Sequence, residues 1–191
     1  YKDEKQIVNG KSIYMGEDPS EGGYVYAEPG IHVNVALLDI ASLHPSTAIV
    51  LKVFGEEYTA NFAMIKQIRI YIKHKEYDKV REMFGGKLAK YLTSDEDAKA
   101  LSFALKIAIN SVYGLTSAKF PNKLRDPRNI DNIVAKRGAL FMITLKHEVQ
   151  KRGFTVAHIK TDSIKIANAT PEIIQFVMDF GKQYGYDFEH E

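Results

Sequence analysis

The chain has 191 residues, of which 45% are apolar and 26% are charged, and its formal net charge is +2. These values suit one globular domain, or a domain with a modest insertion, with enough apolar residues for a core. Cysteine is absent, which excludes disulfides and thiolate metal sites, so any metal would be bound by oxygen or imidazole ligands. No apolar run reaches the ~18 residues that cross a bilayer, and the polar N-terminus lacks the hydrophobic stretch of a signal peptide. We therefore expect no membrane contact and a cytoplasmic location.

Basic residues are concentrated in two stretches of the sequence. Between Lys66 and Lys90, eight Lys or Arg residues stand against three acids, and the segment KFPNKLRDPRNIDNIVAKR from Lys119 has six bases and two acids. Such stretches fit a polyanionic partner. Solvated faces of helices and loops would give the same pattern, so charge alone leaves both interpretations open.

The first part of the chain predicts a loop followed by a β-hairpin. Residues 1–23 are polar and contain Gly, Ser and Pro, which favours a loop or a linker. The segments YVYA and HVNVALLDI are rich in β-forming residues and flank the short turn EPGI, so they predict two paired strands, the second ending near Asp39. Pro45 suits the first turn of a helix after DIASLH.

Residues 61–114 change to the spacing of long helices. Ile65, Ile68 and Ile72 keep a helical period, and this first helix should end where Gly85 and Gly86 interrupt it.

A second helix should begin at SDED, where Ser94 and Asp97 have the spacing of a capping box. Its apolar stripe should consist of Leu101, Leu105, Ala108 and Val112. The two helices would form a helical hairpin between two parts that contain strands.

The last part of the chain predicts a helix, a β-hairpin and a final helix. The first of these helices should run from about residue 130 to 152 and end at Gly153. FTVAHI and SIKIA then predict two strands with Asp162 near their turn. Thr170 and Pro171 should begin an amphipathic helix that runs to about Gly181.

Two acids lie at predicted strand ends that are far apart in the sequence. Asp39 ends one apolar strand, and Asp162 lies 123 residues later beside the turn of another. An antiparallel sheet with these strands side by side would bring the two residues together. A desolvated carboxylate costs several kcal/mol unless a cation or solvent compensates it. An aspartate at a strand end is more often a turn or cap residue, however, so the pair alone does not establish a catalytic site.

Cationic and polar residues share faces of the two predicted helices. Lys106, Asn110 and Tyr113 lie at positions i, i+4 and i+7, and Arg69 and Lys73 lie four residues apart on the other helix. Exposed helix faces commonly carry Arg and Lys because of their helix propensity. Together with two acids on a sheet, these cations match the needs of a nucleoside triphosphate with Mg²⁺.

Three segments, DIASLHPS from Asp39, KIAINSVYG from Lys106 and IKTDS from Ile159, occur in this order. They resemble the motifs DxxSLYPS, KxxxNSxYG and DTDS of family B DNA polymerases. EGGYVYAEPGIHVNVALLDIASLHPS also looks like the segment that leads into the family's palm, with Gly22 and Gly23 at its Gly-Gly motif. Phage replicative polymerases are the closest likeness.

The resemblance implies an α+β fold, with a palm of antiparallel β-sheet that is interrupted by a two-helix fingers hairpin. It places the first part of the palm at 1–60, the fingers at 61–114 and the second part of the palm at 115–191. The sequence stops before the family's KKRY-like motif and thumb, and no acid-bearing exonuclease precedes residue 1. We therefore expect a fragment that binds primer–template DNA poorly when expressed alone, because much of the affinity for DNA comes from summed phosphate contacts.

The resemblance also implies a two-metal polymerase site. Asp39, Asp162 and the backbone carbonyl of Ile40 would bind two Mg²⁺ ions, for which Mn²⁺ could substitute, and Lys106 would act with the two aspartates in catalysis. The implied nucleotide contacts are Arg69, Lys73, Lys106, Asn110, Ser42, Leu43, His44 and Tyr113. The implied DNA contacts are Gly22, Gly23, Gly114 and Thr161. The implied partners are primer–template DNA, deoxynucleoside triphosphates and the exonuclease and thumb domains of the full-length protein, in the cytoplasm of a host cell if a phage encodes it.

This sequence departs from the family pattern at three positions. Lys160 stands where the family usually has an aspartate, so a third acid is missing from the cluster. His44 replaces the tyrosine that stacks under the deoxyribose and excludes a 2′-hydroxyl, which keeps a planar side chain but changes the group that selects the sugar. Ser20 stands where the family has a tyrosine before its Gly-Gly motif.

Two other classes of protein fit part of the pattern. A nucleic-acid-binding relative without catalytic activity would keep the fold and the basic surface, with Lys160 marking the loss of metal binding. Another templated nucleotidyltransferase, such as a reverse transcriptase or a primase-like polymerase, could share a palm with two acids. The segment NSVYG on the second predicted helix argues against it.

Overall fold

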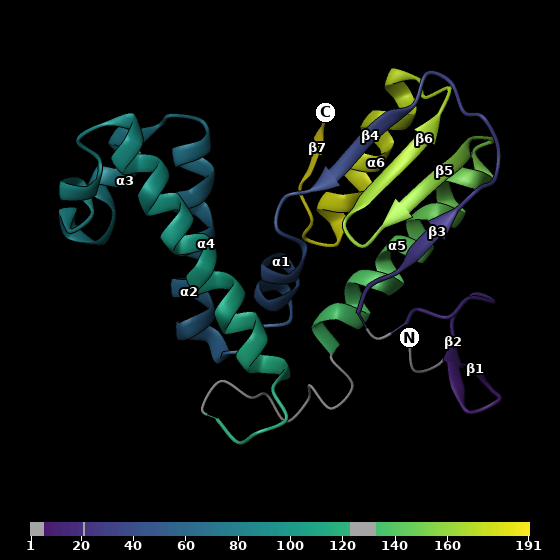
Figure 1. The fold of residues 1–191 in the computed structure, drawn as a ribbon, viewed down its shortest axis with the longest axis horizontal. Coiled ribbons are helices and arrows are strands. Elements are labelled where there is room, and N and C mark those ends of the chain that lie inside the picture. Colours follow the sequence, from purple (N-terminus) through teal and green to yellow (C-terminus); the bar gives the residue numbers. More distant parts are fainter. Residues whose placement is uncertain (1–5, 21, 123–132) are drawn as a thin grey trace. The chain divides into compact units, whose positions relative to one another are not determined.

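A computed structural model describes residues 6–20, 22–122 and 133–191 of the chain (Figure 1). The chain forms two compact units, one composed of residues 1–51 and 128–191 and the other of residues 52–127. The second unit is therefore an insertion in the sequence of the first. Its bounds are wider than the 61–114 expected for the fingers hairpin, because the helical segment begins before residue 61.

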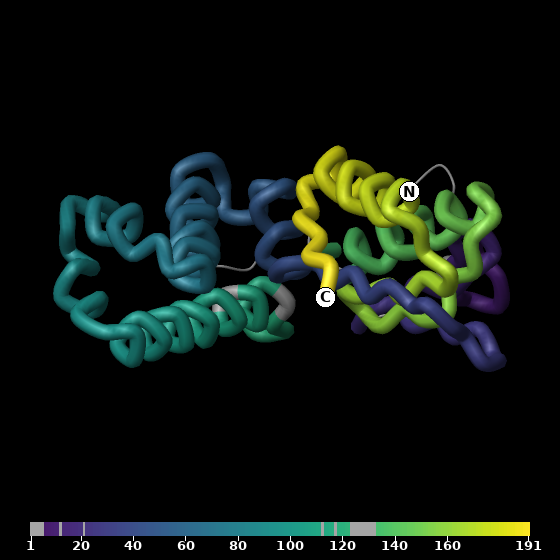
Figure 2. The backbone as a smooth tube through the Cα atoms, turned by 90° about the horizontal axis from the view of Figure 1, so that it is seen from above, coloured from purple at the N-terminus to yellow at the C-terminus, as the bar shows by residue number. Residues whose placement is uncertain are grey.

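The first unit is built on a five-stranded sheet in the order β3-β5-β6-β4-β7, and every pair of neighbouring strands is antiparallel. Two helices, α5 and α6, cover one face of this sheet, as Figures 1 and 2 show from two directions. This arrangement confirms the predicted α+β class with an antiparallel sheet. The elements are β3 (Val25–Ala27), β4 (Ala36–Ile40), β5 (Thr155–Lys160), β6 (Ser163–Ala167), β7 (Phe188–His190), α5 (Ile133–Lys151) and α6 (Pro171–Gln183).

Alternation along the strands separates a buried face from an uncovered one. Leu38, Ile40, Ile164 and Ile166 are almost completely buried against the helices. Because successive side chains of a strand point to opposite faces, their neighbours Asp39 and Lys165 belong to the other face. In Figure 1 no helix of this unit, among the residues described, lies in front of that face.

The predicted hairpin of YVYA with HVNVALLDI is wrong. β3 pairs with β5, whereas β4 pairs with β6 and β7, so the hairpin of β5 and β6 lies between the two strands. The residues that connect β3 to β4 include Ile31, which is 98% exposed. β3 and β4 thus form their backbone hydrogen bonds with β5 and β6, which are distant in the sequence, and not with each other across the EPGI turn.

The predicted N-terminal loop contains a small hairpin, β1 (Gln6–Val8) paired with β2 (Lys11–Ile13). The turn between these strands is Asn9-Gly10, and both residues have positive φ, 51° and 78°. A two-residue turn with positive φ at both positions is the favoured connection of a tight hairpin, and Asn-Gly is its strongest sequence signal. The expectation of a structureless segment overlooked this signal.

Other elements of the first unit agree with expectation. Helix α1 (Leu43–Val50) has Pro45 in its first turn, and β5 and β6 form the predicted hairpin. Helix α6 begins with Pro171 after the cap Thr170, whose Oγ1 accepts a hydrogen bond from the backbone of Ile173. The expected start of the preceding helix, near residue 130, lies outside the described residues, and the basic segment from Lys119 lies partly outside them.

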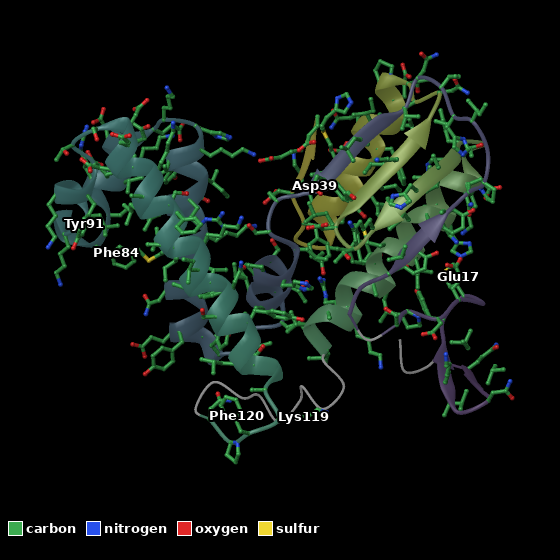
Figure 3. All side chains as sticks on the ribbon, viewed as in Figure 1. Glu17, Asp39, Phe84, Tyr91, Lys119 and Phe120 are labelled. Carbon is green, nitrogen blue, oxygen red and sulfur yellow. The ribbon has the colours of Figure 1, made fainter. Side chains whose placement is uncertain are left out.

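The second unit is a helical hairpin of α2 (Gly55–Lys73) and α4 (Asp95–Ser117), with short helical segments at its tip. The first helix ends at Lys73 and not near Gly85, because Lys75 adopts a left-handed conformation with φ 59°. The chain then continues into the tip, where Figure 3 labels Phe84 and Tyr91. The short segments are α3 (Tyr77–Glu82), η1 (Met83–Gly86) and η2 (Ala89–Tyr91).

Helix α4 begins as predicted, since the Ser94 side chain accepts a hydrogen bond from the backbone N–H of Asp97 at 3.1 Å. Its predicted apolar stripe is partly wrong. Leu101 and Leu105 pack against the core of this unit, but Ala108 is exposed and Ile109 is buried instead. The side chain of Val112, the fourth residue of the predicted stripe, lies outside the described part of the structure. The buried or partly buried positions are therefore 101, 105 and 109, four residues apart, and not 108. Both spacings of three and four residues are compatible with a helix of 3.6 residues per turn.

Candidate active site

The structure brings together the two acids singled out from the sequence, Asp39 in β4 and Asp162 in the turn between β5 and β6. Asp39 lies opposite Ser163 in the register of β4 and β6, and Asp162 immediately precedes Ser163. The backbone N–H of Ile40 donates a hydrogen bond to the carbonyl oxygen of Asp162 at 2.8 Å. This bond extends the pairing of the strands to the residues that carry the acids. Figure 3 labels Asp39 on β4.

The turn that carries Asp162 is held by the segment before β3. Thr161 has a left-handed backbone with φ 57°, and its N–H donates to the carbonyl oxygen of Tyr24 at 2.9 Å. Gly23 packs so closely that a Cβ there would lie 2.8 Å from Thr161 Oγ1. Only glycine fits this contact, so Gly23 supports the turn structurally, whereas a Cβ on Gly22 would meet no neighbouring atom. Ser20, which stands where the polymerase pattern has a tyrosine, donates a hydrogen bond from Oγ to the carbonyl oxygen of Gly23 at 2.7 Å.

A third acid, which the sequence reasoning missed, lies beside Asp39. Glu189 of β7 is directly opposite Asp39 in the register. The preceding residue of β7, Phe188, is buried, so Glu189 belongs to the same uncovered face as Asp39. Like charges directly opposite each other destabilise a sheet, and a bound cation would relieve that repulsion. The only sequence signal for this residue was the short polar alternation in DFEHE.

The acids fit the oxygen ligands that Mg²⁺ prefers. Among the residues that the structure describes, no group of three or more His, Asp or Glu side chains could hold a metal ion. One or two carboxylates are usual where substrate phosphates and water complete the Mg²⁺ shell.

Helix α1 follows the first acid directly and begins with a constrained residue. Ser42 has a left-handed backbone with φ 61°, and its carbonyl oxygen accepts hydrogen bonds from the N–H and the Oγ of Ser46. The Leu43 side chain is buried against Gly138, where a Cβ would lie 3.0 Å from Leu43 Cδ2. Leu43 can thus offer a nucleotide only its backbone.

His44, where the family motif has tyrosine, is partly buried near the second acid. Burial lowers the pKa of the His44 imidazole, and the Asp162 carboxylate opposes that shift. The net direction is downward from an ordinary value near 6.5, so the neutral form of this side chain predominates at pH 7. A neutral ring beside the acids adds no positive charge that would compete with a metal ion.

A buried network fixes helix α1 to the rest of the unit. Tyr186 is fully buried, and its hydroxyl lies 2.7 Å from Thr47 Oγ1 of α1 and accepts a hydrogen bond from Arg137 Nη1 of α5 at 2.7 Å. Burial raises the pKa of the Tyr186 phenol. The next residue, Asp187, also holds the segment before α1, because its carbonyl oxygen accepts a hydrogen bond from the Ala41 N–H. None of these tertiary contacts could be predicted from a motif.

The predicted phosphate-binding residues lie on the helices of the second unit. On α2, Arg69 is half-buried and Lys73 exposed. Burial lowers the pKa of Arg69, and its buried Nε has no hydrogen-bond partner among the residues described. An unsatisfied buried donor costs about 1–3 kcal/mol. An anion that accepted this hydrogen bond would remove the cost.

The predicted nucleotide-binding face of α4 is accessible. Lys106, Asn110 and Gly114 are exposed, and Tyr113 is half-buried. Beside them, Phe103 and Ile107 are 64% and 52% exposed, although both are large apolar residues. This face of the helix therefore combines a cation with an amide and apolar surface, which suits contact with a nucleotide.

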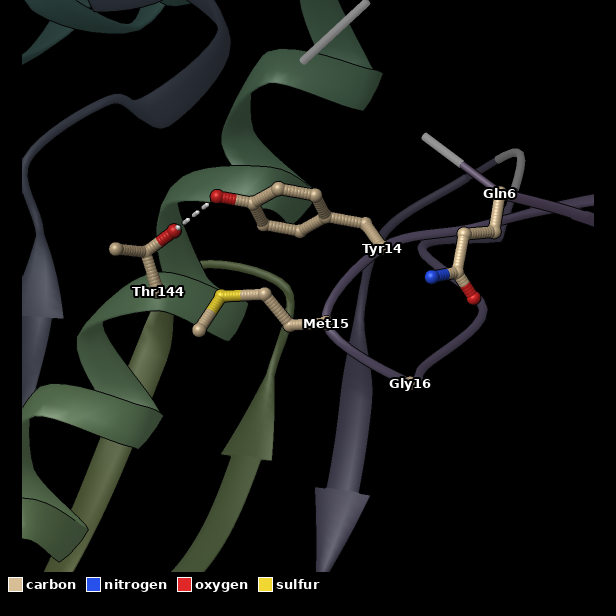
Figure 4. Close-up of a pocket in the computed structure, with 5 residues that line it drawn as sticks. All are labelled: Gln6, Tyr14, Met15, Gly16 and Thr144. Atoms are coloured by element: carbon tan, nitrogen blue, oxygen red, sulfur yellow. Dashed lines mark hydrogen bonds between the residues drawn. The ribbon is translucent and has the colours of Figure 1, made fainter. Parts of the chain in front are cut away.

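The structure also contains a pocket away from the predicted site residues. It has a volume of about 340 Å³ and is lined by Gln6, Tyr14, Met15, Gly16 and Thr144 (Figure 4). Tyr14 and Thr144 are joined by a hydrogen bond of 3.0 Å between their hydroxyls. The pocket therefore lies where the N-terminal segment meets α5, and none of the predicted catalytic residues lines it.

The comparison with solved structures finds a polymerase. The family B DNA polymerase of the hyperthermophilic archaeon Pyrobaculum calidifontis is similar over 88% of this chain, with a TM-score of 0.50 and 12% sequence identity. This likeness shows that the chain shares the fold of part of a family B DNA polymerase. The matched part is 24% of that polymerase's chain.

The sequence comparisons give no match to a family model or to a curated protein. In the part of the chain that the structure describes, no helix is long and apolar enough to cross a membrane.

Proposed function

We propose that this chain carries the palm and fingers of a template-directed DNA polymerase, which adds deoxynucleoside triphosphates to the 3′-hydroxyl of a primer. The observation that carries the proposal is the position of Asp39 and Asp162. Two residues 123 positions apart are joined through the Ile40–Asp162 backbone hydrogen bond, at the end of an antiparallel sheet. The order of the three motifs and the polymerase-like fold support the same conclusion.

The acids provide negative charge where the reaction needs it. Two Mg²⁺ ions, or Mn²⁺ ions, bound by the carboxylates of Asp39 and Asp162 and the carbonyl of Ile40 would supply Lewis acidity for an in-line displacement at the α-phosphate. The carboxylates would offset the charge of these ions at the end of the sheet. Glu189, opposite Asp39, adds to the negative potential at this position.

The second unit provides positive charge for the triphosphate. Lys106 neutralises negative charge that develops on the phosphates in the transition state, and Arg69 and Lys73 bind the triphosphate before transfer. The unsatisfied Nε of Arg69 supports this assignment. Asn110 and Tyr113 line the nascent base pair, and Gly114 leaves room for the template.

The remaining residues of the first unit position the sugar and the DNA. The Ser42 and Leu43 backbones and the neutral His44 ring lie beside the incoming nucleotide, and His44 takes the place of the ring that excludes a 2′-hydroxyl. Gly22, Gly23 and Thr161 lie beside DNA at the turn that carries Asp162. We infer that the intact protein adds exonuclease and thumb domains and replicates a phage genome in the cytoplasm of its host.

Lys160 favours a second candidate, a nucleic-acid-binding relative without turnover. It occupies the position of the family's other aspartate, in the same cross-strand row as Asp39. A cation there lowers the negative potential that holds a metal ion. Another templated nucleotidyltransferase remains the third candidate, against which the NSVYG segment of α4 argues.

The experiment is incorporation of a radiolabelled deoxynucleotide by the intact protein on a primer–template, with and without Mg²⁺. We expect incorporation that requires the divalent ion and follows the template base, and we expect Asp39→Asn to abolish it, since an amide cannot offset the ionic charge. Incorporation of ribonucleotides with equal efficiency would identify a different nucleotidyltransferase. DNA binding with no incorporation at any Mg²⁺ or Mn²⁺ concentration would favour the relative without turnover.

A further inference from the structure

The uncovered face of the sheet is divided by charge. One row across it runs from Lys160 through Ser163 and Asp39 to Glu189, as the registers of the four strands show. The next row pairs His158 with Lys165, and Lys165 with Leu37. Lysines thus occupy β5 and β6, and acids occupy β4 and β7. We call the surface formed by His158, Lys160 and Lys165 the cationic strip.

The side chains of the cationic strip are available to a partner. Lys160 and Lys165 are exposed, His158 is half-buried, and the intervening residues Ile159 and Ile164 are fully buried on the other face. Among the described residues, no carboxylate forms an ion pair with either lysine. The two lysines are diagonal neighbours in the hairpin, a relation that places residues about 7–8 Å apart. Neither lysine is therefore neutralised by an ion pair within the described part of the protein.

The position of the strip relative to the acids restricts which anion it fits. Lys160 lies two strands from Asp39 in the same row, which corresponds to about 10 Å because adjacent strands are about 4.8 Å apart. A sugar-phosphate strand places charges in series, so it can contact Lys160 and Lys165 together and continue toward Asp39.

We propose that the cationic strip binds the phosphates nearest the 3′ end of a DNA primer strand and so directs its 3′-hydroxyl toward Asp39 and Asp162. This inference rests on the proposed function, because a primer end is needed only if the acids catalyse nucleotide addition. The acidic half of the face repels phosphates and the cationic half attracts them, which favours a position in which the last phosphates lie over the lysines and the uncharged 3′-hydroxyl lies toward the acids. Lys160 then has a binding role at the position where the polymerase motif has an aspartate.

The test is the salt dependence of DNA binding, measured by fluorescence anisotropy without divalent ions or nucleotide. The probe is a labelled DNA hairpin with a recessed 3′ end, and the variant is Lys160→Ala with Lys165→Ala. Each phosphate contact that is lost should reduce the slope of log K against log salt by about 1, so we expect the slope to fall by about 2. The matched control, Lys151→Ala with Lys182→Ala, removes the same charge from α5 and α6 on the covered side of the sheet and should retain the wild-type slope.

A second measurement locates the contact. A hairpin with uncharged methylphosphonates at the two linkages nearest its 3′ end should bind the wild-type protein more weakly, and the double lysine variant should not distinguish it from the unmodified hairpin. The proposed role of the strip is refuted if the wild-type protein does not bind the hairpin, or if both lysine pairs change the slope equally. It is also refuted if the methylphosphonates weaken binding by the wild type and by the Lys160/Lys165 variant to the same extent. DNA binding that depends on the strip in a protein without nucleotide incorporation would refute the proposed function but retain the strip as a DNA surface.

Discussion

Replacing Asp162 by asparagine should reduce Mg²⁺-dependent nucleotide incorporation by about three orders of magnitude, equivalent to about 4 kcal/mol of transition-state stabilisation. The shape of the side chain is nearly unchanged, but the amide carries no charge to offset the metal ions. The turn should survive, because the Ile40 N–H bonds to the backbone carbonyl of residue 162 and not to its side chain. The measurement is kcat for primer extension at saturating DNA and nucleotide, at several Mg²⁺ concentrations.

Asp179→Asn is the matched control for this substitution. Asp179 is an exposed residue of α6, where its carboxylate accepts a hydrogen bond from Gln175 at 2.9 Å. The same chemical change there should leave kcat at the wild-type value. Equal losses in both variants, or a wild-type rate in Asp162→Asn, would remove Asp162 from the catalytic site.

Lys160→Asp separates the polymerase from a relative without turnover. If Asp39 and Asp162 suffice for both ions, the variant should still extend a primer at saturating DNA, while its DNA binding becomes weaker through loss of the cationic strip. An inert wild-type protein that becomes active in Lys160→Asp would show that Lys160 has switched the site off.

The second large effect concerns stability. Glu17→Gln should lower the free energy of unfolding by about 3 kcal/mol, because it leaves a buried cation without its counter-ion. Lys146 of α5 is 4% exposed, and its Nζ pairs with Glu17 Oε1. The Tyr24 hydroxyl donates a hydrogen bond to the other oxygen of Glu17, and burial with this contact raises the pKa of the Tyr24 phenol. The variant therefore disrupts the attachment of the segment that leads to Gly23. Urea unfolding at pH 7 measures the change.

Glu148→Gln is the comparison for Glu17→Gln, because Glu148 pairs with exposed cations near the end of α5, the helix that carries Lys146. Glu148 pairs with Lys151 and Arg152 at 2.8 Å, but the cations are 65% and 41% exposed. Exposed pairs contribute about 0–1 kcal/mol, so this variant should unfold within that range of the wild type. A loss in Glu17→Gln no larger than in Glu148→Gln would show that the Lys146 ammonium does not depend on Glu17.

The sequence predicted correctly those elements that depend only on residues close together in the chain. The β5–β6 hairpin, the Ser94 cap and the Thr170-Pro171 helix start depend on residues within one or two turns, and all three are present. The pairing of β3 and β4 was wrong because strand partners are chosen by the buried face of the whole sheet. The early end of α2 was missed for a similar reason. Lys75 and Tyr77 donate hydrogen bonds to Asp95, a contact between residues 20 and 18 positions apart.

The candidate site shows the same division between local and distant determinants. Alternation and motif order predicted that Asp39 and Asp162 lie at strand ends. The pairing of β4 with β6 is what brings the two residues together. Glu189 and Tyr186 could not be predicted, because their relation to the site depends on the register of β7 with β4 and on burial between α1 and α5. Neither residue belongs to a motif that the sequence displays.

The most direct test of a shared metal site is Mn²⁺ binding followed by the paramagnetic broadening of backbone amide resonances. In the wild-type protein, the amides of Asp39, Ile40 and Asp162 should broaden together at low Mn²⁺ concentration. Asp39→Asn and Asp162→Asn should each remove the broadening at both strands, because each acid contributes to one site. Broadening that persists at one strand when the acid of the other is replaced, or that occurs elsewhere in the protein, would contradict a site shared by the two acids.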